Sequence, residues 1–444
     1  MNKFIVQGGK VLNGTTNVSG AKNVALKTLV AACLTSEKVT IENIPLISDF
    51  FVMVDIMKDL GISVVITDHG VEIEAKEIKK HQIPLDKAAL ARTSSMFISP
   101  LLARVGEAII PNPGGCRLGA RPIDRTIEGV KQLSATISYF SDDGYFHAKT
   151  TGLKGATYRF EKNTHTGTET LILTAVLAKG TTILENAAEE PEIDELIDLL
   201  NKMGAKVKRT SKRKIEIIGV DKLHGTHFRI QPDRNEIITF AIAAIITKGD
   251  VFIKDANPLA IKDFLEQLDQ AHGGYEVKKD GIRFYYKDQL VATDTTTSIF
   301  PGFMTDWQAP WAVLMTQATG VSLVHETVFE NKFGYVKDLK RMGAKIELFN
   351  PSVEKPEELY NFNLADDKKT YFHAIRVYGP TQLHDAVVST IDIRAGAAIV
   401  LAALVAKGRT TIFGIEKLDR GYEDFEKRLT NIGASIKRLK EEDE

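Results

Sequence analysis

The chain has 444 residues, of which 43% are hydrophobic, and a formal net charge of −1 from 57 basic and 58 acidic residues. A chain of this length can bury a large core and is expected to divide into two or more domains. The balanced charge argues against a general nucleic-acid or membrane-surface binder, so the basic residues that matter must act locally.

The N-terminus and the cysteines indicate a cytoplasmic protein. Residues 1–9 lack the apolar segment of a secretory signal, and no run approaches the length of uncharged apolar chain that spans a membrane. The two cysteines, Cys33 and Cys116, are too few for a disulfide framework or a zinc site. Cys33 lies in an apolar run, where a packed thiol is expected. We therefore expect no membrane insertion and no metal.

The first stretch whose residues could bind a ligand or take part in a reaction is Val18–Lys27. Ser19 is expected to cap a helix, which places Lys22 and Asn23 in its first turn. A lysine there opposes the helix dipole at a cost of about 0.3–1 kcal/mol unless an anion joins it. Lysine and the free N–H groups of the helix end would hold a phosphate, and the alternative is a solvated surface lysine.

An internal repeat dominates the chain. A helical apolar run that leads into β-forming residues occurs six times, at residues 26–41, 95–110, 170–184, 239–253, 311–324 and 397–412. A second amphipathic helix follows each time and ends in a small-residue turn, at positions 61, 134, 204, 273, 343 and 433. The last two turns are the farthest apart because a charged segment, Asn350–Thr370, lies between them, and we interpret it as an insertion in a surface loop.

A period of about 70 residues predicts an α/β unit of two helices and several strands, three of which could close one domain. Strands are expected at Lys206–Arg209 and Lys214–Ile218, which are rich in β-formers. The junction between the third and fourth repeats, His227–Arg234, is the expected domain boundary, and its composition is not that of a flexible linker.

The stretch Pro113–Pro122 surrounds Cys116 with glycines, prolines and the arginines Arg117 and Arg121. Such a composition predicts a loop rather than a helix or strand. A thiol beside guanidinium groups ionises readily, because the positive field favours the thiolate. Two interpretations stay open here, a reactive cysteine and a surface turn in which the cysteine is incidental.

Six motifs in this order and spacing resemble the UDP-N-acetylglucosamine enolpyruvyl transferases, and the resemblance covers nearly the whole chain. They are Ser19–Asn23, Pro113–Cys116 with Gly119–Pro122, Glu185–Ala188, Thr305–Asp306, Glu326–Asn331 and Asp419–Glu423. The resemblance implies an α/β fold of two inside-out α/β barrel domains, each of three repeated units. Residues 1–20 and 230–444 would form domain I, and residues 21–229 would form domain II with the Cys116 loop.

The resemblance also implies a reaction. Such an enzyme transfers the enolpyruvyl group of phosphoenolpyruvate to the 3-hydroxyl of UDP-N-acetylglucosamine and releases phosphate, through a tetrahedral ketal formed by addition and broken by elimination. This is the first committed step of peptidoglycan synthesis, and it serves cell-wall biogenesis, cell shape and cell division. We expect no cofactor, no nucleic-acid partner and sensitivity to fosfomycin. The oligomeric state stays open, with a monomer as the expectation.

Roles for individual residues follow from the same resemblance. Cys116 would deliver a proton to the methylene carbon, Asp306 would contact the sugar hydroxyl as its base, and Lys22 would take part in catalysis. The residues implied for phosphoenolpyruvate are Lys22, Arg121, Arg394 and Arg420. Those implied for UDP-N-acetylglucosamine are Asn23, Arg92, Arg121, Lys162, Thr164, Asp306 and Val328.

Two of these assignments have alternatives that need no ligand. Asp306 could cap a helix that begins near Trp307. Asp392 and Arg394 could be solvated surface charges at the start of a helix.

Four departures from the family pattern leave the identity of the acceptor open, one of which is Arg125–Thr126 in place of a Leu-His pair. Residues 162–169 form a longer loop that carries His165, in the place where the family contacts the diphosphate and uridine. Met304 replaces a proline, and Lys332 replaces an arginine and gives up its bidentate fork. The alternatives are therefore transfer to a different nucleotide sugar and a catalytically silent paralogue that binds a nucleotide sugar.

Overall fold

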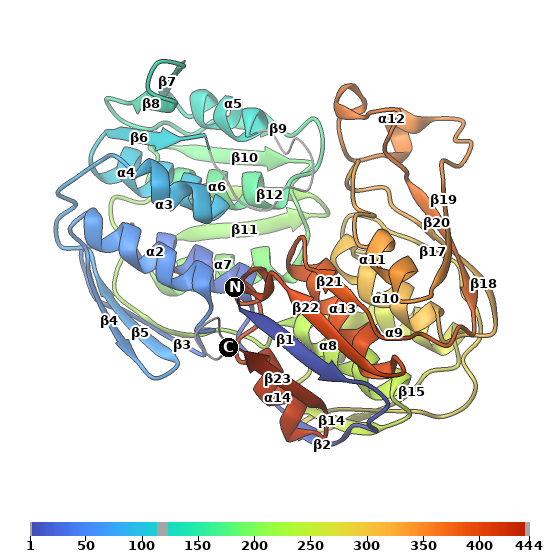
Figure 1. Ribbon diagram of the computed structural model, residues 1–444. Helices are drawn as coiled ribbons and strands as arrows, with labels where there is room; N and C mark the ends of the chain where they lie inside the picture. The colour runs from blue at the N-terminus through green and yellow to red at the C-terminus, as the bar shows by residue number, and fades with distance from the viewer. Residues whose placement is uncertain (1, 113–122, 440–444) are drawn as a thin grey trace. The chain divides into compact units, whose positions relative to one another are not determined.

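The computed structural model describes residues 2–112 and 123–439 (Figure 1). Within them the chain forms two compact units. Unit 1 contains residues 2–19 and 232–439, and unit 2 contains residues 20–112 and 123–231. Each unit repeats one arrangement three times, a central helix, an outer helix and a small sheet, so the predicted α/β fold of six repeats is confirmed.

Unit 2 has central helices that are each followed along the chain by an amphipathic outer helix. The central ones are α1 (Lys22–Ala32), α4 (Ile98–Arg104) with the 3₁₀ helix η1 (Arg92–Phe97) before it, and α6 (His165–Ala175); the outer ones are α2 (Ser48–Asp59), α5 (Asp124–Gln132) and α7 (Pro191–Lys202), and α3 (Leu85–Leu90) is a short extra helix. Almost every residue of α1 is buried, as expected for a helix that is apolar on nearly all sides.

The sheets of unit 2 lie outside these helices. Their strand orders are β13(His227–Arg229)-β3(Val39–Glu42)-β5(Gly70–Glu74)-β4(Ser63–Thr67), β11(Lys206–Ser211)-β12(Lys214–Ile218)-β10(Thr181–Glu185)-β9(Thr157–Arg159), and β6(Glu107–Pro111)-β8(Tyr145–Lys149)-β7(Thr136–Phe140). Both strands predicted from β-formers, β11 and β12, are present. Alternate residues of β5 and β12 are fully buried, which leaves the other face of each sheet nearer to solvent.

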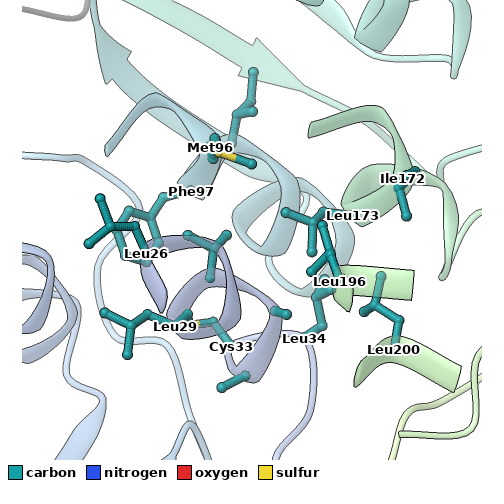
Figure 2. Close-up of a cluster of buried hydrophobic side chains, with 14 of the residues drawn as sticks. Leu26, Leu29, Cys33, Leu34, Met96, Phe97, Ile172, Leu173, Leu196 and Leu200 are labelled. Atoms are coloured by element: carbon teal, nitrogen blue, oxygen red, sulfur yellow. The ribbon is translucent and has the colours of Figure 1, made fainter. Parts of the chain in front are cut away.

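The core of unit 2 is built where the central helices meet (Figure 2). The labelled side chains come from α1, η1, α6 and α7, or follow directly after α1, and they are Leu26, Leu29, Cys33, Leu34, Met96, Phe97, Ile172, Leu173, Leu196 and Leu200. Cys33 is fully buried, and its sulfur donates to the Leu29 carbonyl oxygen at 3.2 Å. The packed thiol that its apolar surroundings predicted is therefore confirmed.

Unit 1 repeats the plan with central helices that contact one another. The central ones are α8 (Arg234–Ile246), α10 (Gln308–Met315) and α13 (Ile393–Val405); the outer ones are α9 (Lys262–Gln270), α11 (Val336–Arg341) and α14 (Phe425–Asn431). Every residue of α8 and α10 is buried, as expected for helices at the centre of the unit. Helices inside and sheets outside are the inside-out arrangement.

The sheets of unit 1 use the N-terminal strands as well as the C-terminal ones. Their orders are β21(Val387–Ser389)-β22(Arg409–Phe413)-β1(Lys3–Gln7)-β23(Ser435–Leu439), β15(Gly274–Lys278)-β16(Gly281–Tyr285)-β14(Asp250–Lys254)-β2(Asn13–Thr16), and β17(Thr295–Thr296)-β18(Gly320–His325)-β20(Ala374–Gly379)-β19(Lys345–Phe349). β1 lies between β22 and β23 and is antiparallel to both. The first strand therefore belongs to a sheet whose other strands all come from residues 387–439 (Figure 1). Among the described helices, none combines the length and hydropathy of a membrane-spanning segment.

Candidate active site

Lys22 begins α1 and is buried rather than solvated. Its Nζ lies 2.8 Å from Asp49 Oδ2, on α2, and the residue is 8% exposed. The prediction that Ser19 caps this helix is wrong, because the N-cap is Ala21, whose side chain cannot accept a hydrogen bond. Ser19 belongs to unit 1, where its hydroxyl donates to Glu423 and its carbonyl accepts from the Asp233 N–H. Lys22 and Asn23 still lie in the first turn of α1.

Arg92, Lys162 and Thr164 also lie in unit 2, at the starts of its central helices. Arg92 is the first residue of η1, which contacts α1. Thr164 caps α6, because its hydroxyl accepts from the Gly167 N–H at 3.2 Å. This cap starts the helix at His165, so the prediction of a loop through residue 169 is wrong. Lys162 is half-buried two residues before the cap.

Glu169, on α6, is a buried carboxylate that sequence reasoning did not single out. Its Oε2 lies 3.2 Å from Lys27 Nζ, on α1, and its Oε1 lies 3.2 Å from His165 Nε2. The Glu169 side chain is completely buried, and that of Lys27 is 6% exposed. Burial lowers the pKa of His165, but Glu169 and Glu190 more than offset this and raise it above its ordinary value.

In unit 1 the structure brings Asp306 and Arg394 together. Asp306 lies inside η3 (Thr305–Trp307). The N-caps of η3 and of the α10 helix that follows are Met304 and Trp307, so the capping alternative for Asp306 is wrong. Asp392 caps α13 by accepting from the N–H groups of Arg394 and Ala395, each at 2.9 Å. Arg394 Nε then lies 3.7 Å from Asp306 Oδ2.

The Arg394 guanidinium is buried, with 7% of the residue exposed, so the alternative of a solvated surface charge is wrong. Burial acts to lower its pKa, but Tyr422, Asp306 and Asp233 raise the pKa above its ordinary value. The guanidinium carbon lies 5.5 Å from the Tyr422 ring centroid. Nη1 has no hydrogen-bond partner among the described residues. A buried cation with an unused donor is suited to an anionic ligand.

Glu326 connects the segments that carry Asp306 and Val328, although no role was predicted for it. Its Oε1 accepts from the backbone N–H groups of Val328 at 2.8 Å and Phe329 at 3.0 Å. Its Oε2 accepts from the Thr305 hydroxyl at 2.9 Å and the Gln308 amide at 3.2 Å. Burial raises the pKa of the Glu326 carboxyl, and Lys332 and the donors of Val328, Phe329 and Thr305 act against that rise.

For the remaining predicted residues the structure gives fewer contacts or none. Arg420 is half-buried in the turn after η5 (Ile415–Lys417). Lys332 is 4% exposed, and its Nζ lies over the Phe329 ring at 5.2 Å with no hydrogen-bond partner in the described part of the chain. Cys116 and Arg121 lie outside the described residues. Across residues 2–112 and 123–439, no three His, Cys, Asp or Glu side chains are grouped to hold a metal.

Known proteins resemble the chain over its whole length. The sequence profile of the family described as EPSP synthase (3-phosphoshikimate 1-carboxyvinyltransferase) matches residues 6–429. The UDP-N-acetylglucosamine 1-carboxyvinyltransferase of Acidobacterium capsulatum is 41% identical over 99% of this chain and 96% of that protein. The protein of the same name from Koribacter versatilis is 39% identical over 99% of this chain and 97% of its own.

Solved structures agree in fold. The enolpyruvyl transferase NikO from Streptomyces tendae superposes with a TM-score of 0.85 over 99% of both chains, at 23% identity. EPSP synthase from Acinetobacter baumannii superposes with a TM-score of 0.73 over 99% of this chain and 100% of that one, at 18% identity. At these identities the structures establish the shared fold, whereas the sequence relatives establish the family. The chain belongs to the UDP-N-acetylglucosamine 1-carboxyvinyltransferases, within the EPSP synthase family.

Proposed function

We propose that this chain transfers the enolpyruvyl group of phosphoenolpyruvate to the 3-hydroxyl of UDP-N-acetylglucosamine, with release of phosphate, for peptidoglycan synthesis. Relatives of that name at about 40% identity over nearly the full length support the activity. We further propose that the enzyme acts in the cytoplasm as a monomer, and that units 1 and 2 are its two domains of three repeats.

The observation that carries the site assignment is the Asp306–Arg394 pair of unit 1. The reaction needs a base for the sugar hydroxyl and cations for the carboxylate and phosphate of phosphoenolpyruvate. Asp306 supplies the carboxylate, and Arg394 supplies a buried guanidinium whose Nη1 is not used by the described residues. Asp392 fixes the start of α13, so Arg394 is held in place by its own helix.

The other roles follow the family pattern. Lys22 and Arg420, with Arg121, would hold phosphoenolpyruvate, and Cys116 would protonate its methylene carbon. The residues assigned to UDP-N-acetylglucosamine are Asn23, Arg92, Arg121, Lys162, Thr164, Asp306 and Val328. Glu326 supports two of these, because it binds the Val328 N–H and the hydroxyl of Thr305, the neighbour of Asp306.

In the proposed mechanism, the Cys116 thiol gives its proton to the methylene carbon of phosphoenolpyruvate while the sugar oxygen attacks the adjacent carbon and Asp306 takes the hydroxyl proton. A C–O bond and a C–H bond form, and the carbon–carbon double bond becomes single. In the elimination, the Cys116 thiolate left by the first step takes a proton from the new methyl group, the double bond is restored and the bond to phosphate breaks. The cations stabilise the departing phosphate.

The test is phosphate release from phosphoenolpyruvate with UDP-N-acetylglucosamine, beside a panel of other UDP-sugars and shikimate 3-phosphate. We expect release with UDP-N-acetylglucosamine that is lost in Cys116→Ala and kept in the matched control Cys33→Ala. Release with another sugar alone would favour a changed acceptor, and no release with any acceptor would favour the silent paralogue. Size-exclusion chromatography with light scattering measures the molar mass in solution and so tests whether the protein is a monomer.

Fosfomycin gives an independent test of Cys116. We expect one fosfomycin adduct in intact-mass spectra of the wild type with UDP-N-acetylglucosamine present, and none in Cys116→Asp. Cys116→Asp should still release phosphate, because a carboxylic acid can also donate the proton. An adduct on a protein without Cys116, or no adduct on the wild type, would contradict the assignment.

A further inference from the structure

The connection between β19 and β20 is far longer than the same connection in other repeats. β19 ends at Phe349 and β20 begins at Ala374, so residues 350–373 lie between two paired strands. Three of the corresponding hairpins are joined by residues 68–69, 212–213 and 279–280, and the β7–β8 hairpin is joined by residues 141–144. Pairing these strands therefore needs only a two-residue turn, and we call residues 350–373 the insertion.

The insertion is folded rather than a loose solvated loop. It contains α12 (Pro356–Leu359) and η4 (Leu364–Asp366). The rings of Tyr360 and Phe362 stack with centroids 4.8 Å apart, and these residues are 5% and 6% exposed. At its base, Asn350 accepts from the His373 N–H at 2.8 Å and donates to the Tyr371 carbonyl at 3.1 Å.

The folded insertion bonds to the residues that lead to Val328. The Tyr360 hydroxyl lies 3.1 Å from His325 Nε2. The Glu326 N–H donates to the His373 carbonyl at 2.7 Å, and the Asn361 N–H donates to the Thr327 carbonyl at 2.8 Å. Three consecutive residues before Val328 are therefore each bonded to residues 360–373.

The pKa shifts of His325 and Tyr360 favour a hydrogen bond in which the tyrosine hydroxyl donates and the imidazole accepts. Burial lowers the pKa of His325, and the neighbouring His373 lowers it further, which favours the neutral imidazole, in which one ring nitrogen can accept. Burial and Asp367 raise the pKa of Tyr360, which keeps its hydroxyl a donor. Asp367 itself lies 3.0 Å from His373 Nε2, so the histidine beside Tyr360 is anchored within the insertion.

We propose that the insertion is a specificity element for the acceptor, which fixes the backbone at Thr327 and Val328 and so determines how the nucleotide sugar is held. This inference rests on the proposed function, in which the Val328 backbone contacts UDP-N-acetylglucosamine. Tyr360 and Asn361 are positioning residues, because they act through residues 325–327. Phosphoenolpyruvate, assigned to arginines and Lys22, should be unaffected.

The experiment compares Tyr360→Phe with a variant in which residues 350–373 are replaced by an Asn-Gly turn. Tyr360→Phe removes one buried hydrogen bond and keeps the ring stack, so the KM for UDP-N-acetylglucosamine should rise roughly three- to tenfold, with the KM for phosphoenolpyruvate unchanged. The Asn-Gly variant should show a larger rise and increased use of other UDP-sugars. The matched control is Lys355→Ala, which removes an exposed ion pair between the N-cap of α12 and Glu358 and should change neither KM.

Calorimetric titration of UDP-N-acetylglucosamine gives the same comparison without turnover, so the inference is tested separately from the proposed function. If the wild type uses another UDP-sugar, that sugar replaces it in both measurements. An unchanged KM and Kd in Tyr360→Phe, or an equal rise in the KM for both substrates, would overturn the proposal. If the Asn-Gly variant does not fold, Tyr360→Phe decides alone.

Discussion

Lys27 Nζ lies 3.2 Å from Glu169 Oε2 inside unit 2, where these side chains are 6% and 0% exposed. His165 Nε2 lies 3.2 Å from the other oxygen of the same carboxylate. Among the described residues, neither oxygen of Glu169 has a hydrogen-bond partner. Coulombic attraction between one buried anion and two basic groups therefore joins α1 to α6.

Lys27→Met should lower the free energy of unfolding by about 3 kcal/mol, because it leaves the buried Glu169 carboxylate with His165 alone. The double variant Lys27→Met/Glu169→Leu should recover much of this loss, since it removes both buried charges. Urea unfolding followed by circular dichroism measures both. A single variant as stable as the wild type would show that this pair contributes nothing.

His165 should make the stability of the protein depend on pH. Because the pKa of His165 is raised in the folded state, its contribution is fully present below the unfolded value of about 6.5. The contribution is lost as the pH rises through the higher folded value. The charged groups acting on His165 are Glu169, Glu190 and Lys27. The difference in urea midpoint between the wild type and His165→Gln should therefore become smaller as the pH is raised above 6. A difference that does not change with pH would contradict this prediction.

Glu326→Ala should destabilise unit 1 and at the same time disturb the residues of unit 1 that we propose bind substrate. The substitution leaves four donors without their acceptor, and each buried donor left unpaired costs about 1–3 kcal/mol. We expect a fall in kcat and a rise in the KM for the sugar nucleotide. Thr305→Val, which removes one of the four bonds, is the control and should show a smaller loss of thermal stability. Equal losses would mean that the carboxylate is not the shared anchor.

Arg394→Lys should raise the KM for phosphoenolpyruvate by tenfold or more, roughly the loss of one charge-assisted hydrogen bond. A lysine keeps the positive charge but not the guanidinium fork. Arg376→Lys is the matched control, because Arg376 forms an exposed ion pair with Glu347 on the outer sheet. In steady-state kinetics, the KM of this control for phosphoenolpyruvate should equal that of the wild type. An unchanged KM in Arg394→Lys would remove Arg394 from the phosphoenolpyruvate site.

Cys33 should resist alkylation in the native protein. Burial raises the pKa of its thiol to about 12, with Arg104 acting in the opposite direction. At pH 8 the thiolate fraction is then about one in ten thousand. Native Cys116→Ala should take up no iodoacetamide at pH 8, and the same protein in urea should take up one equivalent. Labelling of the native variant would contradict the packing shown in Figure 2.

Much of the fold could be predicted because its signals are local. The central helices are apolar on nearly every side, and that pattern repeats along the chain, so α1 and α8 could be located before any contact was known. The helix start at His165 was missed because it depends on whether one hydroxyl, that of Thr164, bonds to a backbone N–H three residues later.

The sequence by itself determined the sixfold repeat, the buried Cys33 and the residues through which the chain resembles its family, because periodicity and motif spacing are properties of the chain alone. Only the tertiary structure decided that Lys27, Glu169 and Arg394 are buried, that Glu326 joins the Thr305 and Val328 segments, and that the insertion bonds to residues 325–327. The partner of a charged side chain comes from a distant part of the chain. Its burial and its protonation are therefore settled only when the repeats pack.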